Sequence, residues 1–249
     1  MKRMMLVIAY DGTGYCGWQL QPGQITVEKV INDTLSELLK EEIKVIGASR
    51  TDSGVHARGN VAVFDTNSRI PPEKICFALN QRLPEDIRIM ESREVDQAFH
   101  PRRIKGQKTY EYHILNRRIA LPTKRLYAAF IYYDLDIAKM QEAANYLVGE
   151  HDFKSFCSVK TQVQDTVRII YRLQVTKMED MITISVTGNG FLYNMVRIIA
   201  GTLIEAGRGA FPPEQVMTML KGCDRALAGP TAPAHGLTLM KIDYDSDDK

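Results

Sequence analysis

The order in which strand and helix patterns follow one another restricts the fold of this chain more than any other feature. Thr26 is a plausible helix N-cap, and the apolar residues after it recur at helical spacing, whereas shorter apolar or alternating stretches predict strands. The first half is predicted to contain strands at residues 4–9, 43–48, 60–65 and 87–90 and helices at residues 27–42 and 71–83. The resulting order is strand, helix, strand, strand, helix, strand.

The second half of the chain repeats this order. We predict strands at residues 108–115, 167–176, 182–186 and 237–242 and helices at residues 137–148, 191–205 and 213–220. With 249 residues, 45% of them hydrophobic, the chain is long enough for two packed cores. We therefore expect an α/β (α+β) fold built from two related split-βαβ, ferredoxin-like halves, residues 1–104 and 105–249.

A short polar turn, residues 50–57, separates two of the predicted strands. It places the carboxylate of Asp52 two residues after the guanidinium of Arg50, and Gly54 supplies the permissive backbone that such a turn needs. One interpretation is a surface ion pair worth about 0–1 kcal/mol. The other is a catalytic turn, because a nearby guanidinium keeps a carboxylate ionised and able to attack or to remove a proton.

The identity of the residues around this turn adds a further indication. The pattern Gly-x-x-Arg-Thr-Asp-x-Gly-Val-His-Ala at residues 47–57 resembles the catalytic motif of the pseudouridine synthases, and among them the tRNA pseudouridine synthase A family. The resemblance extends over essentially the whole chain. It also includes Tyr10-Asp11-Gly12-Thr13, Gly17-Trp18-Gln19, Lys108-Thr109-Tyr110-Glu111-Tyr112, Gly190-Phe191-Leu192 and Met195-Val196-Arg197.

The resemblance implies an isomerase, a tRNA pseudouridine(38-40) synthase. Such an enzyme converts uridine to pseudouridine in the anticodon stem-loop of transfer RNA, with expected positions 38, 39 and 40. It implies no cofactor and no metal, a homodimer, and two halves that form a pseudouridine-synthase fold with a central mixed or antiparallel sheet and a basic cleft. In this arrangement the turn at residues 50–57 would overhang the cleft.

The resemblance also suggests roles for five residues. Asp52 matches the essential aspartate, acting as nucleophile or base. Arg50 either stacks in the gap left by a flipped nucleotide or contacts a phosphate. Tyr110 matches the base-stacking tyrosine, although aromatic residues on strands are commonly core. Arg197 matches the partner of Asp52, or it extends toward solvent from the edge of an apolar helix face. Leu237 matches an apolar residue of the uracil pocket.

The charges are unevenly distributed along the chain. The formal net charge is only +2, but residues 93–125 carry nine basic and three acidic residues, while aspartates crowd the C-terminus. We expect the basic segment to face tRNA phosphates; scattered solvated charges are the alternative.

The cysteines, the histidines and the N-terminal residues indicate the cellular location of the protein and which cofactors it could bind. The four cysteines are far apart and indicate neither a disulfide framework nor zinc, and the histidine spacings match no metal-ligand pattern. The apolar run at the start ends by Ala9, too short for a signal segment or a membrane span. We therefore expect a cytoplasmic protein without metal.

Two other functions fit parts of the pattern. Split-βαβ sheets with exposed aromatic residues also occur in non-catalytic RNA-binding modules, in which Asp52 would be dispensable. A uridine-modifying enzyme could instead use Cys16 or Cys157 as a nucleophile, although no cofactor-binding glycine fingerprint accompanies either residue.

Overall fold

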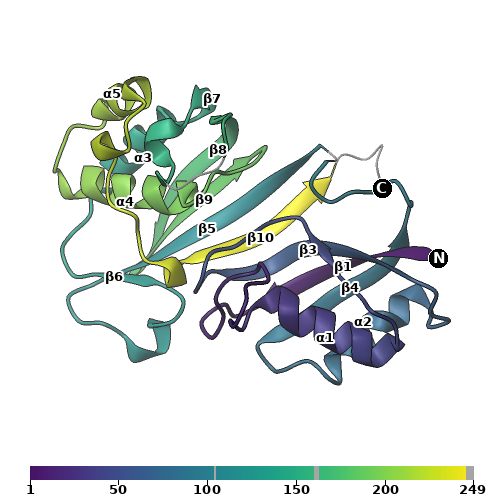
Figure 1. The fold of residues 1–249 in the computed structure, drawn as a ribbon. Coiled ribbons are helices and arrows are strands. Elements are labelled where there is room, and N and C mark those ends of the chain that lie inside the picture. The colour runs from purple at the N-terminus through teal and green to yellow at the C-terminus, as the bar shows by residue number, and fades with distance from the viewer. Residues whose placement is uncertain (104, 160–162, 245–249) are drawn as a thin grey trace. The chain divides into compact units, whose positions relative to one another are not determined.

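The computed structural model describes residues 1–103, 105–159 and 163–244, which form two compact units (Figure 1). The first unit is Met1–Gly106 with Leu239–Lys249, and the second is Gln107–Thr238. The predicted boundary between residues 104 and 105 lies at nearly the same place, but the predicted second half includes the last strand. In the structure most of that strand lies with the first unit, where its Met240 carbonyl oxygen approaches Gly59.

The first unit is a sheet with helices on one face (Figure 1). Its elements are β1 (Lys2–Tyr10), α1 (Val27–Leu39), β2 (Ile46–Gly47), β3 (His56–Thr66), α2 (Ile75–Asn80), β4 (Ile87–Val95) and, from Leu239 onward, β10 (Leu237–Tyr244). The strands lie in the order β4-β1-β3-β10. Strand β1 runs antiparallel to both neighbours, with Met5 opposite Val63 on β3 and Arg93 on β4. This unit therefore follows the predicted order of strands and helices.

The predicted strand at residues 43–48 is reduced to the two residues of β2. The backbone amides before it bond to side chains of α1 and not to a neighbouring strand: Ile43 N–H donates to Ser36 Oγ, and Val45 N–H donates to Asn32 Oδ1. Helix α1 begins after the predicted N-cap, whose side chain accepts from the amide of Lys29. It ends at Leu39, earlier than predicted, because Lys40 turns into the left-handed region at φ 57°.

The second unit contains a mixed sheet and three α-helices among its described residues. Its elements are β5 (Gly106–Asn116), β6 (Ala129–Ile131), α3 (Ile137–Asn145), β7 (Gly149–Asp152), β8 (Val167–Met178), β9 (Met181–Gly188), α4 (Met195–Arg208) and α5 (Gln215–Gly222). The strands lie in the order β5-β9-β8-β7, and β6 pairs with β5 in parallel while the other pairs are antiparallel. The predicted α/β fold with a mixed sheet is confirmed.

Helix α4 is almost entirely buried and supplies much of the core of the second unit. It begins at Met195, four residues after the predicted start, because Asn194 adopts a left-handed conformation at φ 62°. Within the described part of the chain, no helix has the length and apolar character that crossing a membrane requires.

Two glycines of α4 have different surroundings and give a test of its packing. A Cβ at Gly201 would overlap the backbone carbonyl oxygen of Pro230, whereas a Cβ at Gly207 would lie 2.6 Å from the flexible side chain of Met140. We predict that Gly201→Ala lowers the free energy of unfolding by about 1–3 kcal/mol, although alanine is the better helix former by about 1 kcal/mol. Urea denaturation measures the change.

Gly207→Ala is the matched control. Its Cβ would meet side-chain atoms of the buried Met140, Cγ and Sδ, which can shift further than backbone, so this variant should lower the free energy of unfolding by less than Gly201→Ala does. Equal effects of the two substitutions would contradict the proposed contact between α4 and Pro230.

Candidate active site

The turn that carries Asp52 leads directly into β3. The amide of Val55 donates to the carbonyl oxygen of Asp52 over 3.1 Å, and Gly54 closes the turn at φ 78°. Arg50 is exposed and Asp52 is half-buried. The predicted position of these two side chains, on a short turn before a strand, is therefore confirmed.

The loop after β1, residues 11–18, holds this turn through three hydrogen bonds. They run from Trp18 N–H to Thr51 O at 3.0 Å, from Gly12 N–H to His56 Nδ1 at 3.1 Å, and from Ser53 Oγ to Tyr15 O at 3.1 Å. The bonds reach residues on both sides of Asp52. The backbone around the carboxylate is thus fixed by a segment about forty residues earlier in the chain.

Two glycines allow this close approach. A Cβ at Gly12 would overlap the carbonyl oxygen of Val55. Gly17 has φ 81°, and a Cβ there would lie 2.7 Å from the Thr51 carbonyl oxygen and 3.2 Å from the carbonyl carbon of Asp52. Any larger residue at either position would push the loop away from the Asp52 turn.

His56 belongs to the same contact. Its Nδ1 atom lies 3.1 Å from the Gly12 amide nitrogen and 3.1 Å from Asp11 Oδ1. Nδ1 accepts from the Gly12 amide when it carries no hydrogen, and it can donate to Asp11 when it carries one. It therefore bonds to only one of these partners at a time. Among the described residues, no group of His, Cys, Asp and Glu side chains could hold a metal ion.

In the second unit, two tyrosines of β5 point to the same face, as the alternation of residues predicted. Tyr110 is buried, with its ring edge-on to Phe191 at 5.3 Å between centroids and 84° between planes. Tyr112 is completely buried and donates its hydroxyl to the Pro233 carbonyl oxygen over 2.9 Å. Burial raises the pKa of the Tyr112 phenol, so the hydroxyl stays protonated.

Arg197 lies on the first turn of α4 and is half-buried. Its Nε donates to the Ala232 carbonyl oxygen and its Nη1 to Asn194 Oδ1, both over 2.8 Å. In return, the amide of Ala232 donates to the Arg197 carbonyl oxygen over 3.1 Å. These bonds fix the direction of the guanidinium.

Leu237 is buried at the start of β10. The residue before it, Gly236, packs so closely on Tyr112 that a Cβ would lie 2.7 Å from the ring carbon Cζ. The charge of Arg197 acts on the Tyr112 phenol as well, opposing the effect of burial on its pKa. Tyr112 therefore links the surroundings of Arg197 with those of Leu237, a role that the sequence analysis did not assign to it.

The basic residues of the segment 93–125 are mostly exposed. The first unit presents Arg102, Arg103 and Lys105, and the second presents Arg118, Lys124 and Arg125. Burial, followed by the charges of Arg103 and Arg102, lowers the pKa of His100. Each unit therefore has a local group of positive charge that suits phosphate.

Comparison with known proteins decides the family. A family model described as tRNA pseudouridine synthase matches residues 6–102 and 143–245. A tRNA pseudouridine synthase A from Brevibacillus brevis is 50% identical over 98% of this chain and 100% of its own length. The chain belongs to the tRNA pseudouridine synthase A family. The tRNA pseudouridine synthase A of Bacillus subtilis is 46% identical over the same shares of the two chains.

Solved structures add little to this assignment. The archaeal box H/ACA sRNP Nop10-Cbf5 complex aligns with a TM-score of 0.37 and 10% identity, covering 81% of this chain and 44% of that chain. Similarity this weak establishes no common fold. Membership of the tRNA pseudouridine synthase A family thus depends on sequence, and it confirms the resemblance and the predicted class of enzyme, an isomerase.

The five predicted site residues of this family member are divided between the units. Arg50 and Asp52 belong to the first unit, whereas Tyr110, Arg197 and Leu237 belong to the second. Within the second unit, Tyr112 connects the last two.

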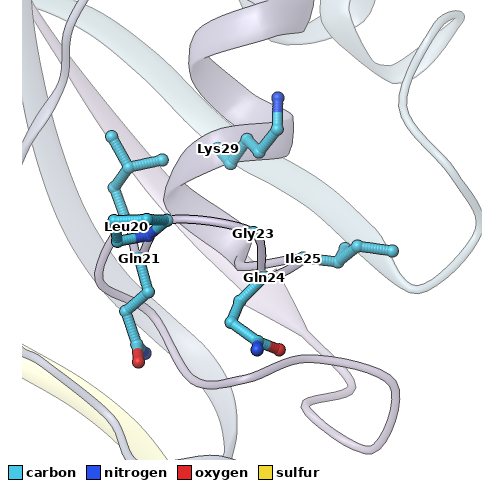
Figure 2. A pocket seen from close by; sticks show the side chains of 7 residues that line it. Leu20, Gln21, Gly23, Gln24, Ile25 and Lys29 are labelled. Carbon is cyan, nitrogen blue, oxygen red and sulfur yellow. The ribbon is translucent and has the colours of Figure 1, made fainter.

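A hollow of about 450 Å³ lies beside the loop that follows Gly17 and is lined by residues 20–25 and Lys29 (Figure 2). Cys16 orders this loop, since its carbonyl oxygen accepts from Gln21 Nε2 over 2.9 Å and its thiol donates to Gln24 Oε1 over 3.0 Å. The second cysteine considered as a nucleophile, Cys157, is buried. The structure thus shows Cys16 as a residue that orders this loop through its hydrogen bonds to Gln21 and Gln24.

The close approach of Gly17 to the Asp52 turn makes a specific prediction. Gly17→Ala should lower the free energy of unfolding by about 1–3 kcal/mol, because alanine is strained at this φ and its Cβ meets the Thr51 carbonyl. Turnover should fall as well, since the Asp52 turn must shift. Urea denaturation and a turnover assay on tRNA measure the two effects.

Gly14→Ala provides the control in the same loop. A Cβ at Gly14 would have no atom within 4 Å, and Gly14 lacks a positive φ. Stability should stay within about 0.5 kcal/mol of the parent and turnover should be unchanged. If Gly17→Ala behaved in the same way, the proposed constraint on the turn would be wrong.

Proposed function

We propose that this chain isomerises uridine to pseudouridine in the anticodon stem-loop of transfer RNA, at positions 38, 39 and 40, with Asp52 as the catalytic residue. The observation that supports this role is the Asp52 turn itself. It presents a half-buried carboxylate on a backbone that Trp18, Gly12 and Tyr15 hold on both sides. Family membership supplies the tRNA substrate and the type of reaction.

The reaction needs a carboxylate and no external water. The bond between N1 of uracil and C1′ of ribose breaks, the base turns, and C5 joins the same C1′. The C5 proton then leaves and N1 gains a proton, so the product has the atoms of the substrate. An ionised Asp52 acts as a nucleophile or removes a proton; both roles are consistent with its position on an accessible turn.

Two arginines act around this carboxylate in the proposal. Arg50, exposed on the same turn, occupies the gap left by the flipped nucleotide or contacts its phosphate. Arg197 is the partner that orients the Asp52 carboxylate. Its bonds to Ala232 and Asn194 support this role, because a guanidinium with a fixed direction aligns an anion better than a freely rotating one.

Tyr110 and Leu237 bind the uracil. A ring beneath the base lets it turn without fixed hydrogen bonds, and a leucine side chain adds an apolar wall. Both residues are buried within the second unit, and the contact of Tyr110 with Phe191 holds its ring in one orientation.

The remaining features concern binding and context. The exposed basic groups, Arg102 with Arg103 and Lys124 with Arg125 among them, contact tRNA phosphates. The enzyme works as a homodimer in the cytoplasm. The Asp-rich end of the chain, residues 245–249, lies outside the described residues.

The central prediction concerns Asp52→Asn. With tRNA transcribed from uridine labelled with tritium at C5, the parent should release tritium to water, because C5 loses its hydrogen when it joins the ribose. Asp52→Asn should release none above background while its affinity for tRNA and its unfolding midpoint stay at the parent's values. Scintillation counting, filter binding and thermal unfolding provide the three measurements.

Each other outcome has a definite meaning. Release by Asp52→Asn at the parent's rate would remove Asp52 from the mechanism. If neither protein released tritium but both bound tRNA tightly, a non-catalytic RNA-binding module would be the better description.

Tyr110 gives a second test of the same reaction. If the ring supports the base, Tyr110→Phe retains the stacking surface and should lose much less turnover than Tyr110→Ala. Tyr110→Ala loses one base contact worth about 1–3 kcal/mol, which predicts a reduction in turnover of roughly five- to 150-fold. Equal losses would assign the role to the hydroxyl. Thermal unfolding of both variants separates this effect from damage to the contact with Phe191.

A further inference from the structure

A buried hydrogen-bond chain lies directly behind the Asp52 turn. The hydroxyl of Tyr10, at the end of β1, is 2.7 Å from Thr51 Oγ1. Asn60 on β3 donates from Nδ2 to the Tyr10 hydroxyl at 3.4 Å and to the Ser49 carbonyl oxygen at 3.1 Å. Tyr10, Thr51, Asn60 and Ser49 are all buried.

Asn60 fixes the direction of one bond in this chain. Its Oδ1 accepts from the Val61 amide over 2.9 Å, which leaves Nδ2 as the donor to Tyr10. The Tyr10 and Thr51 hydroxyls share the next bond, in which either oxygen can be the donor. Tyr10 is thus hydrogen-bonded to the residue that immediately precedes Asp52.

Thr51 is held at its main chain as well. Its carbonyl oxygen accepts from the Trp18 amide over 3.0 Å, and the rings of Trp18 and Tyr10 lie 5.9 Å apart. The side chain and the carbonyl group of Thr51 are therefore fixed by two neighbouring aromatic residues. With both ends of Thr51 held, the peptide that links it to Asp52 has little freedom to rotate.

We infer that Tyr10 is a positioning residue of this enzyme: its hydroxyl, acting through Thr51, sets the position of the Asp52 carboxylate for the reaction. The inference rests on the proposed function, because it assumes that Asp52 is catalytic. Tyr10 itself touches neither substrate nor reacting atoms in this role. A carboxylate displaced by about 1 Å loses on the order of a hundredfold in rate, so a hydroxyl that prevents such a shift affects turnover strongly.

The alternative is that the Tyr10 hydroxyl contributes only to stability. The chain offers a matched control in the same unit: Tyr244 donates its hydroxyl to the Pro101 carbonyl oxygen over 3.0 Å, and its ring packs edge-on to Phe99 at 5.2 Å. Tyr10→Phe removes a hydroxyl that bonds to Thr51 and Asn60, and Tyr244→Phe removes one that bonds to Pro101. Only the first lies next to Asp52.

The experiment compares kcat and KM of the full chain by tritium release from tRNA labelled at C5 of uridine, below the unfolding midpoint of every variant. We expect Tyr10→Phe and Thr51→Val each to lower kcat by about tenfold or more, with KM and tRNA affinity unchanged. Thr51→Ser keeps a hydroxyl and should retain most of the parent's kcat. Tyr244→Phe should keep the parent's kcat.

The double variant Tyr10→Phe/Thr51→Val gives the sharpest test. If the two hydroxyls act through one hydrogen bond, the double variant should be no slower than the slower single variant. Losses that multiply, a loss in Thr51→Ser equal to that in Thr51→Val, or an unchanged kcat in Tyr10→Phe would each overturn the inference.

The parent and Asp52→Asn are measured alongside these variants to separate the two proposals. An inactive parent, or an active Asp52→Asn, would overturn the proposed function and with it the role of Tyr10. A parent that depends on Asp52 but not on Tyr10 would overturn the positioning role alone.

Discussion

The Asp52 turn depends on backbone contacts so close that no side chain fits between them. Gly12 faces the Val55 carbonyl and Gly17 faces the Thr51 carbonyl, and both belong to a loop that connects β1 with α1. Because these contacts join the end of one core strand to the start of another, the turn takes its rigidity from the core. Trp18, buried on the same loop, extends the contact into that core. A reactive carboxylate on a short exposed loop would lack such support.

The second unit uses the same physical principle around Arg197. The chain at Pro230 approaches α4 so closely that Gly201 cannot carry a side chain, and Ala232 then exchanges two hydrogen bonds with Arg197. The helix and the segment beside it therefore fix each other. In both units a proposed functional side chain projects from backbone that is packed against another segment. Precise placement follows from this packing, because packed atoms leave a charged group few alternative positions.

The sequence predicted the order of the long elements well, because repeated apolar spacing over several turns or residues is a strong local signal. Its failures have tertiary causes. The strand expected at residues 43–48 is short because Asn32 and Ser36 of α1 bind its amides, and β6 and β7 are too short to produce a clear pattern. Strand β10 was expected with the second half, since a strand pattern does not indicate which neighbour it will pair with. Asp52 and Arg50 could be recognised from a contiguous motif, whereas the bond from Tyr10 to Thr51 joins residues 41 positions apart.

Tyr110 and Tyr112 show why burial alone does not separate a structural aromatic residue from one proposed to bind substrate. They lie two residues apart on the same face of β5, and both are buried. For Tyr112, the hydrogen-bond partner of the hydroxyl says more about its role than burial does. Its phenol bonds to the Pro233 carbonyl oxygen, and burial favours the protonated form, so both its ring and its hydroxyl are occupied by the protein. Tyr112 is therefore a structural residue, and the segment it holds, from Pro233 to Gly236, leads directly to Leu237.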